Sequence, residues 1–153
     1  MLQHLHQEQI IPASIEQVWD FFATPTNLNA LTPPEMKFVT VGEPPTTMQA
    51  GQLYEYDISL FPGIWMRWLT EIRQVRFREF FADEQRFGPY RFFYHSHHFE
   101  PVDGGVKMID HIVYDVGYGP LGWVLNKLLV RRKLNQIFTY RRHRISEIFP
   151  KPS

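Results

Sequence analysis

The ionisable side chains best placed for chemistry lie in two short segments of the last third of the chain. His95 and His97 alternate on an expected strand, so both side chains point to the same face. Asp110 lies on the next expected strand. If Gly104 and Gly105 form the turn, His95 faces Tyr114, His97 faces Ile112 and Asp110 is diagonal to His97, about 7–8 Å away between backbones. The spacing predicts two imidazoles and one carboxylate on one hairpin face, although a slip of one residue would reassign the pairs.

This cluster allows three interpretations. It can be a buried polar network in which the carboxylate and the imidazoles satisfy one another. It can be the polar anchor of a pocket, where it orients a ligand or acts as an acid and a base. It can also hold a metal, because two histidines two residues apart and a carboxylate are a known ligand set. Such sets are common by chance, so we expect no metal and no cofactor.

A second charged pair, Glu71 and Arg73, alternates with Leu69. It either adds charge to the same interior or forms an ion pair that faces solvent, and we expect the latter. The sequence has no nucleophile elbow, P-loop, dinucleotide fingerprint or zinc-protease helix. It also has no cysteine, which excludes disulfides, thiolate nucleophiles and cysteine-based zinc sites.

Aromatic residues are unusually frequent, at 16% of 153 residues. Large rings fill protein cores and also wall ligand pockets, where a few polar groups fix the orientation of the ligand. We therefore expect a pocket around His95, His97 and Asp110. Its expected walls are Tyr56, Trp68, Phe93, Phe99, Tyr114 and Leu125.

The elements that must position these residues begin with a strand over residues 3–11. Ser14 and Gln17 have the spacing of a capping box, which predicts the start of a short helix, and Pro25 suits the first turn of a second one. Alternating patterns predict strands over residues 36–41, 52–61, 64–76, 77–86, 90–102 and 106–116. A long helix over residues 122–149 closes the chain. The length fits a single domain, residues 1–153.

The last helix has an unusual pattern of apolar residues. At 100° per residue, one early set and one late set lie on nearly opposite faces, which a straight helix with one buried stripe does not explain. We expect a bend or an interruption near residues 129–133. The first segment is then either a lid for the pocket or buried on all sides. The early set is Leu121, Val124, Leu125 and Leu128, and the late set is Leu134, Ile137, Phe138, Ile145 and Ile148.

Charge is unevenly distributed along this neutral chain. Residues 119–153 contain eight Lys and Arg residues and one Glu, a net charge of +7, so residues 1–118 carry −7. A basic helix can be solvated, pair with the body, or contact an anionic membrane or a partner protein. Because the whole chain has no excess positive charge, we expect no nucleic-acid binding. The first residues lack the pattern of a signal peptide, and we expect a cytoplasmic protein. The oligomeric state is left open.

The order of these elements resembles the START-like, birch-pollen-allergen-like helix-grip superfamily, also called SRPBCC or polyketide cyclase/dehydrase-like. The resemblance covers essentially the whole chain and is closest to one small bacterial subgroup. It implies an α+β fold in which a curved antiparallel sheet of about seven strands wraps around a long C-terminal helix, with two short helices after the first strand. The segments that carry it are Ile11-Pro12-Ala13-Ser14 through Phe22, residues 22–38 (FATPTNLNALTPPEMKF), Gly88-Pro89-Tyr90, His95-x-His97-x-Phe99, Gly119-Pro120-Leu121-Gly122 and Ile137-Phe138-x-Tyr140-Arg141.

The superfamily includes lipid and sterol carriers, quinone-binding proteins, hormone receptors, aromatase/cyclases and the catalytic domains of Rieske oxygenases. Membership implies a hydrophobic cavity between sheet and helix, but function depends on the site and not on the fold. We expect binding of a hydrophobic or aromatic small molecule, such as a lipid, isoprenoid or polyketide. The alternative is a cyclase or dehydratase that uses a His–Asp pair as acid and base.

Overall fold

The computed structural model describes residues 1–43, 47–61 and 63–151, and its elements follow the expected order. The chain begins with a strand, a short helix, a 3-10 helix and a short strand: β1 (Gln3–Ile11), α1 (Ile15–Phe22), η1 (Pro25–Leu31) and β2 (Lys37–Thr40). Five strands follow: β3 (Leu53–Phe61), β4 (Ile64–Arg76), β5 (Phe80–Phe87), β6 (Phe92–Val102) and β7 (Gly105–Asp115). The C-terminal helix comprises α2 (Gly119–Leu125), a π-helical turn η2 (Asn126–Val130) and α3 (Arg131–Ile148).

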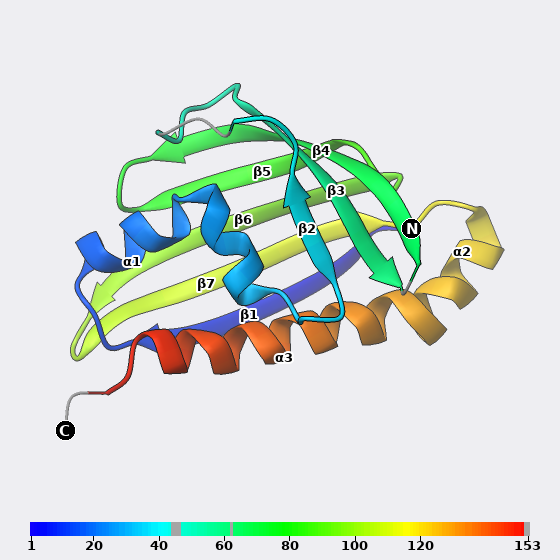
Figure 1. Ribbon diagram of the computed structural model, residues 1–153. Coiled ribbons are helices and arrows are strands. Elements are labelled where there is room, and N and C mark those ends of the chain that lie inside the picture. The colour runs from blue at the N-terminus through cyan, green and yellow to red at the C-terminus, as the bar shows by residue number, and fades with distance from the viewer. Residues whose placement is uncertain (44–46, 62, 152–153) are drawn as a thin grey trace.

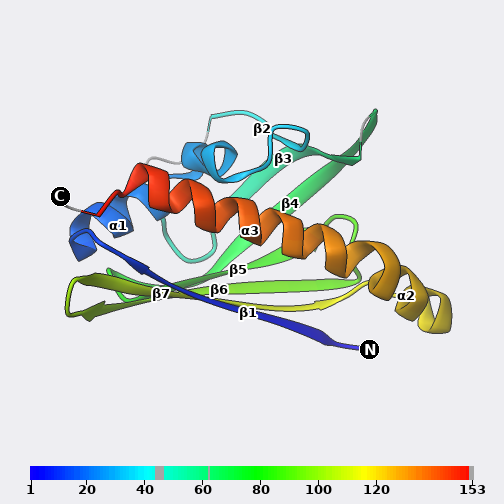
Figure 2. The same cartoon turned by 90° about the horizontal axis from the view of Figure 1, so that it is seen from below.

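All seven strands form one antiparallel sheet with the order β1-β7-β6-β5-β4-β3-β2. The sheet curls around the C-terminal helix, so that α3 runs between β2–β4 on one side and β5–β7 with β1 on the other (Figures 1 and 2). The register of β4 against β5 shifts twice, between Leu69 and Thr70 and between Ile72 and Gln74. Such irregularities bend a strand and increase its twist. The predicted helix-grip fold is confirmed.

The capping box predicted at the start of α1 is present. The backbone amide of Gln17 donates to the Ser14 hydroxyl at 3.3 Å, and the backbone amide of Ser14 donates to Oε1 of the Gln17 side chain at 3.1 Å. These bonds satisfy amides that have no partner inside the helix. Val18 and Trp19 on the inner face of α1 are buried against the sheet. The capped turn therefore sets the direction in which the aromatic side chains of α1 enter the interior.

The C-terminal helix is interrupted, as its two apolar faces predicted. The π-helical turn at Asn126–Val130 begins slightly earlier than expected. An extra residue in one turn rotates everything after it around the helix axis, which explains why the apolar faces on its two sides differ. Gly122 permits the tight entry, because a Cβ there would lie 1.6 Å from the Gly117 carbonyl oxygen. The alternative that the first segment is buried on all sides is wrong, since Leu121 and Leu128 are exposed.

The predicted register of the β6–β7 hairpin is also wrong. The turn lies at Asp103 and Gly104, because Val102 pairs with Gly105. His95 therefore faces Ile112, and His97 faces Asp110 directly. Asp-Gly is a preferred sequence for a two-residue turn. The predicted turn, Gly104 and Gly105, begins one residue too late and therefore leaves out Asp103. The error moves each partner by two residues, so every side chain keeps its predicted face.

Two groups of buried apolar residues form the core. One lies under α1 and contains Trp19, Phe81 and Phe99, whereas the other lies towards α2 and contains Trp68, Phe93 and Phe138. The charged residues of the predicted site lie on the sheet face that both groups cover. Among the described residues, no helix is both long enough and apolar enough to span a membrane.

Candidate ligand-binding site

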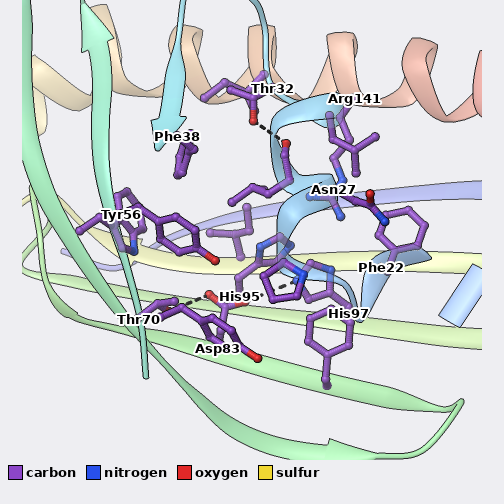
Figure 3. Close-up of a pocket in the computed structure, with 18 of the residues that line it drawn as sticks. Phe22, Asn27, Thr32, Phe38, Tyr56, Thr70, Asp83, His95, His97 and Arg141 are labelled. Carbon is purple, nitrogen blue, oxygen red and sulfur yellow. Dashed lines mark hydrogen bonds and ion pairs between the residues drawn. The ribbon is translucent and has the colours of Figure 1, made fainter. Parts of the chain in front are cut away.

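A cavity of about 190 Å³ lies between the sheet and the helices. Its lining combines residues of α1, η1 and α3 with inward-facing residues of six strands, β2 to β7. Figure 3 shows Asp83, His95 and His97 on the sheet side and Phe22, Asn27 and Arg141 on the helix side. The apolar lining includes Phe22, Phe38, Tyr56, Trp68, Phe93 and Phe138. The cavity is therefore an apolar space with a charged group on one wall.

Asp110 is the centre of the charged group. Its Oδ1 lies 2.9 Å from Nε2 of His95 and 2.9 Å from Nδ1 of His97. The first contact is a hydrogen bond, while the second is an ion pair whose N–H is poorly aligned, leaving Nδ1 of His97 without a hydrogen bond. Nη2 of Arg141, which enters from α3, lies 3.6 Å from the same oxygen. Three positive or polarisable groups thus share one buried carboxylate.

Asp83 extends this group towards the next strand. It pairs with His95 across β5 and β6, and its Oδ2 lies 3.5 Å from Nε2 of His97. The Thr70 hydroxyl on β4 donates to the other Asp83 oxygen at 3.2 Å. We call Asp83, His95, His97, Asp110 and Arg141 the inner cluster. It joins three strands of the sheet to α3.

The two histidines are driven towards opposite protonation states. Burial, and to a smaller extent the nearby His97, lower the pKa of His95 to about 4, so His95 is neutral at pH 7. Burial also acts against the charged form of His97, but the contacts with Asp110 and Asp83 outweigh it and raise its pKa. The Asp110 pKa is held well below its usual range, because Arg141 and the two imidazoles outweigh the effect of burial. The site therefore places a neutral imidazole beside one whose surroundings favour the protonated form, with ring centroids 3.8 Å apart.

Three residues of this cluster could hold a metal ion. One ligand atom each of Asp83, His95 and His97 lies within 4.8 Å of the others. Asp83 thus replaces Asp110 in the set considered from the sequence, and Asp110 instead contacts a nitrogen of each imidazole. Charge already balances without a cation, because two carboxylates face Arg141 and a His97 with a raised pKa. We therefore treat the cluster as an ionic network and retain the metal as a measurable alternative.

The predicted site residues divide into three groups. Tyr56, Trp68, Phe93, His95 and His97 line the cavity, and Asp110 lies behind the histidines. Phe99 packs instead under α1, with its ring centroid 5.7 Å from that of Trp19. Tyr114 donates a hydrogen bond to Asn126 at 2.9 Å, and neither it nor Leu125 lines the cavity.

Asp83, Thr70 and Arg141 were not predicted as site residues. Arg141 lies on the inward-facing, apolar side of α3, and the residue is only 8% exposed. Its guanidinium carbon is 5.3 Å from the centroid of the Phe22 ring. Its place on the same helix face as Leu134 and Phe138 was the signal that could have separated it from the exposed basic residues. For Asp83, the signal was its alternation with Phe81 on β5.

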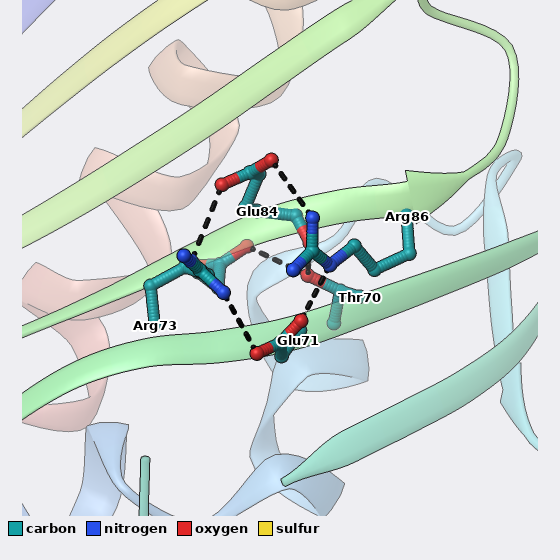
Figure 4. Close-up of polar contacts among 6 residues, drawn as sticks. Thr70, Glu71, Arg73, Glu84 and Arg86 are labelled. Carbon is teal, nitrogen blue, oxygen red and sulfur yellow. Dashed lines mark hydrogen bonds and ion pairs between the residues drawn. The ribbon is translucent and has the colours of Figure 1, made fainter. Parts of the chain in front are cut away.

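Glu71 and Arg73 lie on the opposite face of the sheet, as expected for an ion pair that faces solvent. They form a network with Glu84 and Arg86 (Figure 4). Arg73 Nη1 is 2.9 Å from a Glu71 oxygen, and Arg86 pairs with both acids. We call these four residues the outer cluster. It adds no charge to the cavity.

The chain matches one known family over most of its length. Residues 11–137 match the family described as polyketide cyclase / dehydrase and lipid transport. The match covers the cavity-lining strands and the beginning of α3. A comparison with curated protein sequences finds no match.

Solved structures share the fold at low sequence identity. TTHA0849 from Thermus thermophilus is 18% identical with a TM-score of 0.67, covering 95% of this chain and 99% of that one. CV1439 from Chromobacterium violaceum is 12% identical with a TM-score of 0.70, covering 99% of both chains. Norcoclaurine synthase from Thalictrum flavum, solved with dopamine and hydroxybenzaldehyde, is 15% identical with a TM-score of 0.66, covering 97% of this chain and 86% of that one. At these identities, the likeness concerns the fold alone.

Proposed function

This chain belongs to the polyketide cyclase/dehydrase and lipid transport family, and from that premise we propose that it binds a hydrophobic or aromatic small molecule in the cavity between sheet and α3. The observation that carries the proposal is an apolar cavity with one buried, charge-balanced cluster on its wall. Apolar walls supply affinity, and a few fixed polar groups supply orientation.

The size of the cavity favours a compact ligand. An apolar cavity of about 150 Å³ is large enough for benzene, whereas sites for drug-sized molecules usually span about 300–1,000 Å³. The volume of this cavity, about 190 Å³, is closer to that of the benzene-sized cavity. We therefore favour a ligand of aromatic or polyketide type with a single ring or two fused rings. A longer lipid or isoprenoid would place only part of its length in this space.

The inner cluster favours a ligand with a hydroxyl or carbonyl group. With its Nε2 proton donated to Asp110, neutral His95 keeps a lone pair on Nδ1 that can accept from a hydroxyl. His97, whose pKa is raised, can donate from Nε2, the nitrogen on the Asp83 side, to a carbonyl or to a phenolate. A hydrogen bond that involves a charged group stabilises a complex by about 1.5–3 kcal/mol, roughly tenfold to a hundredfold in affinity.

The first test is native mass spectrometry of gently purified protein, followed by solvent extraction of any adduct. A bound organic molecule of one or two rings is the expected result and gives the chemical class. A stoichiometric transition metal would instead favour the Asp83–His95–His97 metal alternative and contradict the anchor proposed here.

A matched pair of ligands distinguishes the contribution of the apolar walls to affinity from that of the inner cluster. We expect 1-naphthol to bind at least about tenfold more tightly than naphthalene, because only the former can hydrogen bond to the cluster. His95→Gln should remove this preference, whereas Phe93→Ala should weaken both probes equally. Equal affinities for the two probes in the wild type would contradict the anchor role. Failure of both to bind, in a folded protein, would contradict the cavity as a site for compact aromatics.

A second candidate function is acid–base catalysis on such a molecule. The observation that favours it is the pair of adjacent imidazoles whose pKa values move in opposite directions, an arrangement suited to one base and one acid. Turnover of the extracted compound or its relatives should then fall by about 10²–10⁴-fold in His95→Gln, His97→Gln or Asp110→Asn. A rate and a pH profile unchanged by all three substitutions would exclude this chemistry.

A further inference from the structure

One end of the molecule carries a group of exposed apolar side chains away from the cavity. The antiparallel topology brings the start of β1, the start of β4, the end of β5 and helix α2 to this same end (Figures 1 and 2). Six large side chains of the segment that contains α2 and η2 are exposed. They are Tyr118, Leu121, Trp123, Val124, Leu128 and Leu129.

A second element presents apolar side chains at the same end. Ile64 and Trp65 are the first residues of β4, and both are more than half exposed. In Figure 2 the β3–β4 pair and α2 lie apart from each other at this end. Exposed apolar groups on two separate elements are typical of a surface that contacts another apolar phase. We call the segment 118–133 together with Ile64 and Trp65 the apolar end.

The charge of this end is uniformly positive. Lys127, Arg131 and Arg132 are exposed, and within the described chain none of them forms an ion pair. No acidic residue occurs between Asp115 and Glu147. The two acids of β3, Glu55 and Asp57, are both paired with Arg67.

These observations select one kind of partner. Trp and Tyr side chains favour the interface between water and lipid, and Lys and Arg beside them are attracted to anionic lipid head groups. A helix with an apolar side and basic flanks lies in the plane of such an interface without crossing it. We propose that the apolar end docks on the surface of an anionic lipid bilayer. The −7 charge of residues 1–118 would orient the protein with this end towards the membrane.

The four tryptophans provide a direct test. Trp65 and Trp123 are about half exposed at the apolar end, whereas Trp19 and Trp68 are buried in the core. Vesicles of phosphatidylcholine with one quarter phosphatidylglycerol should shift tryptophan emission to the blue, and brominated lipid should quench it. The double variant Trp65→Phe and Trp123→Phe should lose both signals, although it still sediments with the vesicles. Vesicles of pure phosphatidylcholine should bind at least about tenfold more weakly, and high salt should remove the difference.

Two sets of variants separate charge from apolar insertion. Neutralising Lys127, Arg131 and Arg132 to Gln should weaken binding by about fivefold per residue, roughly a hundredfold in total. Trp123→Ser with Leu128→Ser should weaken binding by at least tenfold and leave the unfolding temperature nearly unchanged. The matched controls are Lys151→Gln and Ile10→Ser, both exposed and outside the apolar end, which should change nothing.

The proposal would be overturned by equal binding to neutral and anionic vesicles, or by variants that bind like the controls. It would also be overturned by a dimer in sedimentation velocity that buries Trp123, because a second copy would then be the partner. Binding of 1-naphthol is measured without vesicles. Failure of membrane docking is thus distinguishable from failure of the cavity proposal.

Discussion

Two charged clusters lie on opposite faces of the sheet, and both include a residue of β5. On β5, Asp83 points into the inner cluster, while its neighbour Glu84 points out into the outer cluster. Both clusters mix carboxylates with cations at comparable distances. They differ in solvent access: the side chains of Asp110 and Arg141 are 8% and 9% exposed, against 41% for both Arg73 and Arg86.

Similar contacts therefore have different energetic consequences on the two faces of the sheet. A buried charge loses its hydration, so it is stable only while its partners remain in place. An exposed charge that loses its partner is solvated again at little cost. The inner cluster should thus behave as one unit, and the outer cluster as a set of nearly independent side chains.

The largest expected effect is that of Asp110→Asn. This change keeps the shape but leaves Arg141 and His97 buried without their shared counter-charge. Removing one partner of a buried ionic group typically destabilises a protein by about 3–5 kcal/mol. Denaturant unfolding of the variant and of the outer-face control Glu84→Gln should show a large loss only for Asp110→Asn. Equal losses in the two variants would contradict the distinction between the faces.

A double-mutant cycle tests whether the inner cluster behaves as one unit. Asp110→Asn and Arg141→Met should couple, because the second change removes the cation that the first leaves uncompensated. We expect a coupling energy of about 1–3 kcal/mol from unfolding of the two single variants and the double variant. The parallel cycle of Arg73→Gln with Glu84→Gln should give a coupling near zero in physiological salt. Additive losses in the inner cycle would show that Arg141 and Asp110 act separately.

The next effect appears in the dependence of stability on pH. His95 has a folded pKa of about 4 against an ordinary 6.5, so between these values the unfolded chain binds the additional proton and stability falls as pH falls. Asp83 and Asp110, whose pKa values are lowered, add a further loss below about pH 4. His97, with its raised pKa, contributes stability that is lost as pH rises above 6.5.

Substitution of His95 should therefore flatten the acid side of the stability curve. Between pH 6.5 and 4, His95→Gln should reduce the slope of unfolding free energy by up to about 1.4 kcal/mol per pH unit. The exposed His143→Gln is the matched control, because it removes an imidazole from the surface and not from the interior. An unaltered slope in His95→Gln would contradict a buried neutral imidazole at this position.

The sequence predicted which side chains face the interior more accurately than it predicted which residues form the inner cluster. Strand periodicity placed His95, His97 and Asp110 on one face, and a register error of two residues could not change that face. Asp83 joins them only because β5 pairs with β6 in one register, which local patterns do not determine. Arg141 points inward because the π-helical turn sets the phase of α3, and a count of basic residues along the chain does not distinguish it from its exposed neighbours.

The predicted walls show the same limit. Phe93 and Trp68 line the cavity, but Phe99, six residues after Phe93 on the same strand face, lies under α1 and packs against Trp19. Alternation says which face a ring occupies and not how far along the curved strand the cavity extends. The boundary depends on where α1 covers the sheet, which is a tertiary contact.

The smallest expected effect is that of Arg86→Gln in the outer cluster. Arg86 pairs with Glu71 and Glu84, but both cations of the cluster are well exposed, and Arg73 remains beside both acids. The unfolding temperature should fall by about 2 °C or less in low salt, and the difference should vanish near 1 M NaCl, where charges are screened within about 3 Å. Thermal unfolding at both salt concentrations measures this directly. A loss as large as that of Asp110→Asn, and insensitive to salt, would mean that the outer cluster is as cooperative as the inner one and that burial is not what separates them.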